Sequence, residues 1–208
     1  MSTSSSVLFP FLFLQRAAFM AEKLGFGVVD AVIKALDDSG YSKQTAQKVM
    51  IQSTNSSVLV KFKQETKYDL VYMIEEDVRD AAPSSLADIK KFASAVSVST
   101  KSIFPTTNQF LTNQTNNLVT SLQSSGLPVY VYLLMNEFVS QPYDFFSDAT
   151  AQINGYVQGA KVDGVITDFP GTAHRYKCMF LITFSCITLS LAFQIHVIVT
   201  EFVANLVH

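Results

Sequence analysis

Short apolar runs alternate along this chain with segments of helical periodicity, and this alternation constrains the fold more than any other feature. The runs occupy residues 49–53, 70–74, 96–104, 129–135 and 164–167. The connections between them are long enough to hold a helix, whereas an antiparallel hairpin needs only a few residues, so the strands are predicted to be parallel. The run VYVYLLM at 129–135 is apolar throughout, which is typical of a parallel strand covered on both faces. The sequence therefore predicts an α/β fold with five parallel strands.

The segments between these runs carry apolar residues at helical spacing. One stripe extends from Val28 to Leu36 and ends at Ser39-Gly40, which is a helix stop signal. Further helices are predicted up to residue 67, from 84 to 96, from 111 to 122, from 149 to 160 and after Pro170. An open doubly wound sheet and part of a barrel both fit this order, and composition does not separate them. Gly25-Phe26-Gly27 lacks the third glycine of a nucleotide-binding loop and is interpreted as a helix-entry turn.

Charge and composition exclude one class of function. The formal net charge is −2 and charged residues make up 15% of the 208 residues, with no stripe of Lys or Arg. Such a chain has no means of neutralising a phosphate backbone, so nucleic acid is not an expected partner. Apolar residues make up 49%, and much of the excess lies at the two ends.

The two ends of the chain are predicted to lie outside the domain, which covers residues 18–177. Residues 1–17 form an apolar leader, but no Lys or Arg precedes its apolar run, which argues against a secretory signal. Residues 178–208 form a hydrophobic tail, and 178–199 holds no charged residue and is long enough for a transmembrane helix. Gln194 and His196 interrupt this run, so a buried or misannotated tail is an equal alternative. The only two cysteines, Cys178 and Cys186, lie here without metal spacing, and a disulfide framework is not expected.

Two sequons mark candidate glycosylation sites. They are Asn55-Ser56-Ser57 and Asn113-Gln114-Thr115. They matter only if the chain enters the secretory pathway. The expected localisation is the secretory pathway, the cell surface or a membrane.

Four segments resemble the glycerophosphodiester phosphodiesterase family, and most of all its plant cell-surface branch. They are MIQSTNSSVLVKFK (50–63), YDLVYMIEE (68–76), PVYVYLLMNE (128–137) and VDGVITDFPGTAHRY (162–176). The resemblance runs from about residue 18 to residue 176. It implies a (β/α)8 barrel that hydrolyses glycerophosphodiesters to glycerol 3-phosphate and an alcohol, usually with Ca²⁺ or Mg²⁺. Lipid and glycerol metabolism is the implied setting.

The family's chemistry is attributed to two histidines, the first in a His-Arg pair after strand one, and to metal-binding Glu-x-Asp and Glu-x-Lys motifs after strands two and three. None of these motifs stands where the family places it, since no His precedes His174 and the run 49–53 matches the family's fourth strand. The chain is therefore expected to be a truncated form, the last five βα units of a barrel, without the catalytic and metal residues. The sequence does not decide whether this chain is active by itself. The alternative to a truncated enzyme is a non-catalytic cell-surface or wall-associated protein of the same fold.

Polar residues at the ends of the predicted strands are candidates for the rim of a substrate pocket, because parallel barrels place their sites at the carboxyl ends of the strands. The candidates are Gln52, Ser53, Glu137 and Asp168. Each has a structural alternative. Ser53 and Asp168 are also placed to cap the next helix, and Glu137 is equally well a solvated loop residue.

Other charged residues are weaker candidates. The run Glu75-Glu76-Asp77 is interpreted as a solvated loop rather than a cation site. His174 follows the last strand, and on an outer helix it would point away from the barrel mouth, so it is not expected to be catalytic.

Overall fold

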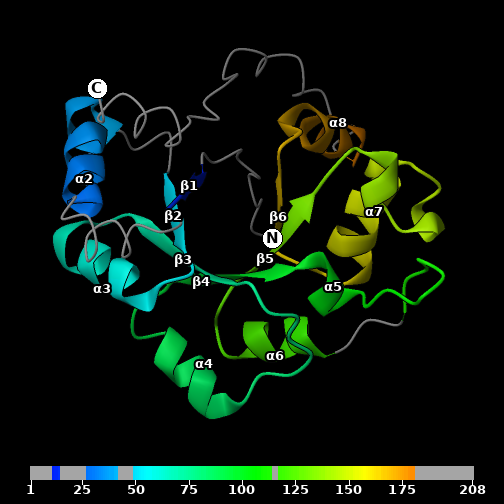
Figure 1. Cartoon of the computed structure of the whole chain (residues 1–208), viewed down its shortest axis with the longest axis horizontal. Helices are drawn as coiled ribbons and strands as arrows, with labels where there is room; N and C mark the ends of the chain where they lie inside the picture. The colour runs from blue at the N-terminus through cyan, green and yellow to red at the C-terminus, as the bar shows by residue number, and fades with distance from the viewer. Residues whose placement is uncertain (1–10, 15–26, 42–48, 114–116, 181–208) are drawn as a thin grey trace. The chain divides into compact units, whose positions relative to one another are not determined.

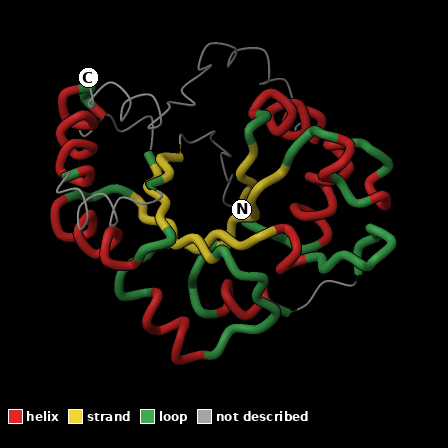
Figure 2. The backbone as a smooth tube through the Cα atoms, viewed as in Figure 1, coloured by secondary structure: helices red, strands yellow, loops and turns green. Residues whose placement is uncertain are grey.

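The computed structural model describes residues 11–14, 27–41, 49–113 and 117–180. These residues belong to two compact units that divide between Leu70 and Val71. Figure 1 labels the helices and strands of both units, and Figure 2 shows how helices and strands alternate along the chain.

In the first unit two short strands pair in parallel, β1 (Phe11–Phe13) and β2 (Met50–Ser53). Leu14 extends this pairing, because its N–H donates to the carbonyl of Gln52 at 2.9 Å. The hydroxyl of Ser53 donates to the carbonyl of Leu14 at 3.2 Å. The sequence analysis did not predict β1, which lies inside the apolar segment assigned to the leader.

Two helices complete the described part of this unit, α2 (Val28–Asp38) and α3 (Ser56–Glu65). Asn55 is the N-cap of α3, and its side-chain oxygen accepts the N–H of Ser57 at 2.8 Å. This bond satisfies one of the free donors at the start of the helix. Phe62 of α3 is fully buried and anchors the helix in the core of the unit. Both helices were predicted, α2 from the helical spacing of its apolar residues and α3 from the mixture of polar and apolar residues that follows the strand.

The second unit contains four strands that pair in parallel in the order of the sequence. They are β3 (Asp69–Ile74), which begins at the unit boundary, β4 (Ala95–Ser99), β5 (Val129–Leu134) and β6 (Gly164–Thr167). This arrangement confirms the predicted α/β fold with parallel strands. The strand expected at 96–104 is shorter than predicted, because the hydroxyl of Ser99 accepts the N–H of Ser102 at 3.1 Å and caps a helical turn.

Helices join the strands of this unit. They are α4 (Pro83–Ile89), α5 (Thr100–Ile103), α6 (Leu118–Ser124), α7 (Ala149–Asn154), which continues as a π-helical turn at Gly155–Gly159, and α8 (Pro170–Phe180). Two 3₁₀ turns, η2 (Phe138–Ser140) and η3 (Tyr143–Phe145), lie between β5 and α7. The helix predicted from residue 111 begins only at Leu118, because Thr106 and Thr112 form a β-bridge that keeps this loop extended.

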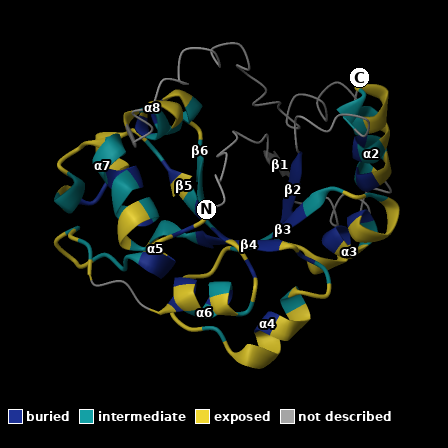
Figure 3. Cartoon of the chain, turned by 180° about the vertical axis from the view of Figure 1, so that it is seen from behind, coloured by how far each residue is buried: buried dark blue, intermediate teal, exposed yellow. Residues whose placement is uncertain are grey.

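The core of the second unit lies between its strands and these helices. Successive residues of a strand point to opposite faces, and Val129 and Val131 of β5 are fully buried in the helix-facing cluster. Tyr130 and Tyr132 alternate with them and are only partly buried. Figure 3 shows buried residues in dark blue along β2 and β4, whose residues are among the most buried of the strands, and on the inner faces of the helices.

The amino ends of β5 and β6 are tied together by one carboxylate. Asp163 Oδ2 accepts the N–H of Val129 at 2.8 Å and the Nε2 of Gln123 at 2.9 Å. Gln123 lies on α6, so this carboxylate joins two strands and a helix at the end of the sheet opposite to the strand exits.

Helix α8 ends at Phe180, and the hydrophobic tail expected beyond it, including the candidate membrane segment 178–199, lies almost wholly outside the described residues. A hydrophobic C-terminal helix is therefore not supported. Within the described ranges, none of the helices combines the length and the apolar character that crossing a bilayer requires. Cys178 of α8 is disulfide-bonded, where the sequence analysis expected no disulfide framework.

Candidate functional site

An open hollow of about 520 Å³ lies where β5 and β6 end and α8 begins. Its lining comes from the loop after β5, the turn after β6 and the first two turns of α8: Asn136, Asp168, Phe169, Pro170, Gly171, Thr172 and Arg175. This is the carboxyl end of the strands, where parallel barrels place their sites.

The hydroxyl of Thr172 organises the polar part of this hollow. Thr172 is only 6% exposed. Its Oγ1 accepts from Asn136 Nδ2 at 2.9 Å and from Arg175 Nη2 at 3.3 Å. Thr172 thereby holds an amide from the β5 loop and a guanidinium from α8 next to each other.

The turn that carries Asp168 is fixed by Thr167. The hydroxyl of Thr167 donates to the carbonyl of Leu134 at 2.7 Å and accepts the N–H of Phe169 at 3.0 Å. The exposed Asp168 stands between these anchored residues, and α8 begins at Pro170. Phe169 therefore precedes the helix directly, and the helix begins at Pro170, where the capping alternative for Asp168 placed its first turn.

The lining of the hollow favours an anionic or polyhydroxyl ligand. The guanidinium of Arg175 and the amide of Asn136 donate hydrogen bonds, and the N-terminus of α8 contributes the positive end of a helix dipole. Asp168 is the one carboxylate among the lining residues and is suited to accept hydrogen bonds from hydroxyl groups.

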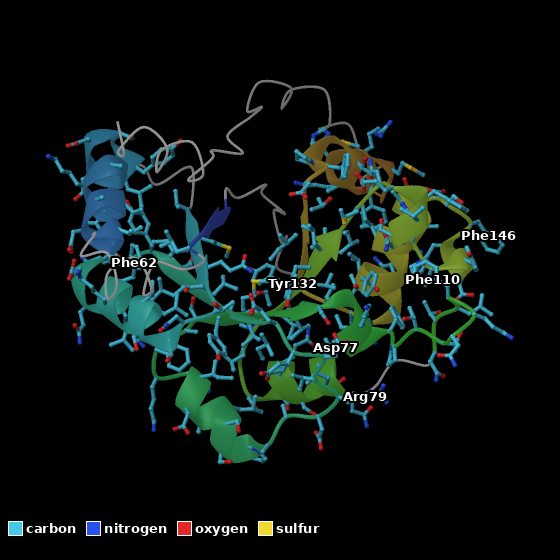
Figure 4. The ribbon with its side chains drawn as sticks, viewed as in Figure 1. Phe62, Asp77, Arg79, Phe110, Tyr132 and Phe146 are labelled. Carbon is cyan, nitrogen blue, oxygen red and sulfur yellow. The ribbon has the colours of Figure 1, made fainter. Side chains whose placement is uncertain are left out.

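A second polar group lies where β3 and β4 end. Asp77 Oδ1 accepts from the hydroxyl of Ser99 at 2.7 Å, and Ser102 Oγ accepts the N–H of Val78 at 2.9 Å. These bonds connect the loop after β3 to the first turn of α5. Asp77 itself is exposed at the strand exit, and Figure 4 labels its position together with that of Tyr132.

Tyr132 extends from β5 toward this group and donates its hydroxyl proton to the carbonyl of Ile74 at 2.6 Å. Burial, together with the negative charges of Glu75 and Asp77, raises the pKa of Tyr132 from 10.0 to about 12. Its phenol is therefore protonated at neutral pH and acts as a hydrogen-bond donor, not as a base.

The described residues do not fit the divalent cation that the family resemblance implies. Ca²⁺ and Mg²⁺ take several oxygen ligands, most of them carboxylates, carbonyls or water. The described part of the chain contains no group of three or more His, Cys, Asp or Glu placed to hold a metal ion.

The predicted rim residues fall into two pairs. Asp168 lines the hollow, whereas the exposed Glu137 follows the lining residue Asn136 without lining the hollow itself. Gln52 and Ser53 belong to the first unit and are 3% and 0% exposed. The N-cap of the helix after them is Asn55, which replaces the capping role considered for Ser53.

The remaining candidates are exposed. Glu75, Glu76 and Asp77 lie in an exposed loop, as the sequence analysis predicted. His174 is exposed on α8, with its ring nitrogens 3.8 and 3.9 Å from the sulfur of Cys178, and it does not line the hollow.

Sequence reasoning missed Asn136, Thr172 and Arg175 as lining residues. A signal for two of them was available, because Thr172 and Arg175 stand three residues apart at the start of a helix that follows Asp168. Residues at this spacing lie on one helical face.

Comparison with known proteins identifies relatives of this chain. The sequence profile of the Glycerophosphoryl diester phosphodiesterase family matches residues 14–172. The Arabidopsis thaliana glycerophosphodiester phosphodiesterases GDPDL3 and GDPDL1 are each 56% identical to it, over 164 and 165 residues, which is 79% of this chain. The Arabidopsis thaliana protein SUPPRESSOR OF NPR1-1 CONSTITUTIVE 4 is 49% identical over 164 residues, again 79% of this chain.

The matched region is a minor part of these relatives. The chain spans 22% of the length of GDPDL3 and of GDPDL1, and 15% of the third relative. Among solved structures, a putative glycerophosphoryl diester phosphodiesterase from Silicibacter pomeroyi matches with a TM-score of 0.48 and 14% identity. That match covers 76% of this chain and 46% of the other.

Proposed function

The chain belongs to the glycerophosphoryl diester phosphodiesterase family, and we propose that it binds glycerophosphodiesters, whose hydrolysis to glycerol 3-phosphate and an alcohol is the reaction implied by the family resemblance. Its proposed part in this reaction is to bind the glycerophosphate portion of the substrate. The hollow at the ends of β5 and β6 carries the proposal, because it gathers hydrogen-bond donors at a helix N-terminus.

The chemistry of the substrate matches this lining. A phosphodiester carries one negative charge and accepts hydrogen bonds from guanidinium and amide groups. Arg175 and Asn136 supply these donors, and Thr172 sets their spacing. The hydroxyl groups of the glycerol would donate to Asp168 across the same hollow.

Hydrolysis also needs an acid, a base and charge neutralisation at the phosphate. The hollow contains one exposed carboxylate and no histidine. We therefore expect the chain to bind the glycerophosphodiester and to leave it intact. Added Ca²⁺ or Mg²⁺ is expected to release no choline from glycerophosphocholine, and metal-dependent release would show that this chain holds the whole catalytic set.

Binding is tested by titration calorimetry of the full chain with glycerol 3-phosphate and glycerophosphocholine. Arg175→Gln removes a charge-assisted hydrogen bond and is expected to weaken binding about tenfold or more. The control is Lys177→Gln, which removes the same charge from α8 outside the hollow. Equal losses in the two variants, or no binding by the unmodified chain, would reject the hollow as the substrate site.

A second candidate function is that of a non-catalytic cell-surface or wall-associated glycoprotein of the same fold, with the hydrophobic segment 178–199 as a membrane attachment. It is favoured by the position of the two sequon residues, since Asn55 and Asn113 are both exposed. A shift in electrophoretic mobility after enzymatic deglycosylation of the plant-expressed chain would support entry into the secretory pathway. Asn55→Ser with Asn113→Gln should abolish that shift, and an unshifted native chain would count against this candidate.

A further inference from the structure

Three aromatic rings and a valine form an exposed surface in two loops of the second unit, one between α5 and α6 and the other between β5 and α7. This aromatic surface consists of Phe110, Phe138, Val139 and Tyr143, which line a hollow of about 270 Å³. Phe138 is 59% exposed, Tyr143 54% and Val139 81%. Single exposed apolar residues need no explanation, but several that gather in one place mark an interaction surface.

The rings of the aromatic surface contact one another at an angle. The ring centroids of Phe110 and Tyr143 are 5.5 Å apart with the planes at 79°, and those of Phe138 and Tyr143 are 6.4 Å apart at 37°. A small molecule needs a concave site that buries most of its surface, and rings in mutual contact do not provide one. Tilted neighbouring rings instead present a stepped surface, which suits an extended guest that lies across it.

The two loops that carry the rings are held together by hydrogen bonds. The N–H of Tyr143 donates to the carbonyl of Phe110 at 3.0 Å. The neighbouring Asp144 Oδ2 accepts both the N–H and the hydroxyl of Thr112. Phe110, which Figure 4 labels, has a φ of 57°, a left-handed conformation that is uncommon for a bulky residue and persists where its surroundings hold it. The aromatic surface is therefore preformed.

The charge of these loops selects the sign of a guest. Residues 104–113 and 136–148 contain three carboxylates, Glu137, Asp144 and Asp148, and no Lys, Arg or His. Asp144 accepts from Thr112, and Asp148 accepts the N–H of Thr150 at the start of α7. Glu137 is exposed and directly precedes Phe138, so it is the carboxylate best placed to pair with a cationic guest.

We propose that the aromatic surface binds a proline-rich peptide segment that carries Arg or Lys beside its prolines. Proline-rich segments adopt the extended polyproline II helix without a partner and dock on surfaces lined by aromatic side chains. Little conformational entropy is lost when such a segment binds, so a small surface suffices. Polyproline II leaves its carbonyls unpaired, and the exposed Tyr143 can donate its hydroxyl to one of them.

The aromatic surface shares no lining residue with the polar hollow at the ends of β5 and β6. The proposal therefore stands independently of the glycerophosphodiester binding proposed above. The two sites can be tested on the same preparation of the full chain, and loss of one activity says nothing about the other.

The test titrates the full chain into three fluorescein-labelled peptides and follows their anisotropy. The first peptide is a run of prolines with an arginine at each end, the second has alanine for every proline, and the third has glutamate for both arginines. The first should bind about tenfold or more tightly than the second, because the alanine peptide must be ordered on binding. It should bind about 2- to 5-fold more tightly than the third. Binding of none of them, or equal binding of any two, overturns the proposal.

Variants then locate the site. Tyr143→Leu keeps apolar volume but removes the ring that contacts the other two, so binding of the first peptide should weaken about fivefold or more. The matched control is Tyr41→Leu in the first unit, which should leave peptide binding unchanged. Circular dichroism confirms that each variant is folded. Equal effects of the two substitutions would overturn the assignment to this surface.

A charge variant tests the contact without changing the rings. Glu137→Gln should abolish the preference for the arginine peptide over the glutamate peptide. Glu76→Gln removes the same charge from an exposed position after β3 and should keep that preference. An unchanged preference in Glu137→Gln would contradict the proposed charge pairing.

A second copy of the chain is the other possible occupant, and analytical ultracentrifugation of the full chain distinguishes it. The proposal expects the same association state in the unmodified chain and in Tyr143→Leu. Self-association that Tyr143→Leu abolishes, without binding of the proline peptide, would assign the aromatic surface to contact between copies and overturn the proposal.

Discussion

The ring of Tyr130 lies so close to Gly164 that a Cβ on residue 164 would approach two of its ring carbons to 2.7 Å. The two residues are register partners on β5 and β6. Real Cβ atoms essentially never come so close to a neighbour. A glycine in β6 therefore leaves the space that the tyrosine of the adjacent strand fills.

Gly164→Ala is expected to destabilise the chain by about 1–3 kcal/mol, because the added methyl group overpacks this contact. The free energy of unfolding from chemical denaturation measures the effect. Gly171→Ala is the control, because nothing lies within 4 Å of its added Cβ. An alanine in α8 should leave stability unchanged or raise it by up to about 1 kcal/mol. Equal destabilisation by both substitutions would refute the packing argument.

Tyr132 is expected to titrate at about pH 12 in the folded chain, above its ordinary value of 10.0. Absorbance difference spectra of the unmodified chain and Tyr132→Phe isolate its titration from those of the other tyrosines. Glu75→Gln removes a nearby negative charge and should lower the pKa of Tyr132, whereas Glu65→Gln in the first unit should leave it unchanged. A titration of Tyr132 near pH 10 in the folded chain would contradict this environment.

The same shift has a consequence for stability in alkali. Because the folded chain holds the phenolic proton of Tyr132 more tightly than the unfolded chain, this contribution to stability is complete below pH 10. It is lost as the pH rises from about 10 to about 12. The slope of unfolding free energy against pH in this window should be shallower in Tyr132→Phe than in the unmodified chain. Identical slopes would show that the pKa of Tyr132 does not differ between the folded and the unfolded chain.

Asn55→Ala is expected to cost about 0.5–2 kcal/mol, because it removes the side-chain oxygen that caps α3. Asn55→Ser keeps a capping oxygen and should cost much less, although it also removes the sequon. Thermal and chemical unfolding of the unglycosylated protein compare the two. If both substitutions cost the same, the cap contributes nothing to stability.

Asp144→Ala is expected to free the loop that it joins to Thr112, and the amide of Thr112 should exchange with solvent about tenfold faster or more. Hydrogen exchange followed by mass spectrometry of the peptide containing Thr112 measures this. Glu137→Ala is the control, since it removes the same charge from an exposed position in the same loop. An unchanged exchange rate in Asp144→Ala would show that other contacts hold the loop.

The parallel strands were predictable because each is a compact apolar run, and the run at 129–135 became β5. The end of β4 was not, because the hydroxyl of Ser99 turns the chain into a helix where the apolar pattern continues. The three-residue strand β1 was also missed. Its apolar residues are equally compatible with a leader, and only the pairing with β2 distinguishes the two.

Of the residues that line the candidate site, the sequence analysis predicted only Asp168. Asp168 stood out because it follows a strand directly, and it does line the hollow. Glu137 was predicted because of its charge, but its neighbour Asn136 is the residue that lines the hollow. The amide of Asn136 donates to the hydroxyl of Thr172, which is 36 residues away in the sequence. A contact of that kind is created by the fold and leaves no local pattern.

The carboxylate of Asp163 shows that the two ends of the strands in the second unit have different roles. It secures the amino ends of β5 and β6, while the polar hollow is lined by residues that follow the carboxyl ends of these strands. Substitutions of Asp163 should therefore lower the stability of the folded chain. Substitutions in the exit loops should instead change ligand binding. Because Asp163 lies at the amino ends of these strands and the lining of the polar hollow follows their carboxyl ends, substitutions in the exit loops leave the Asp163 hydrogen bonds in place.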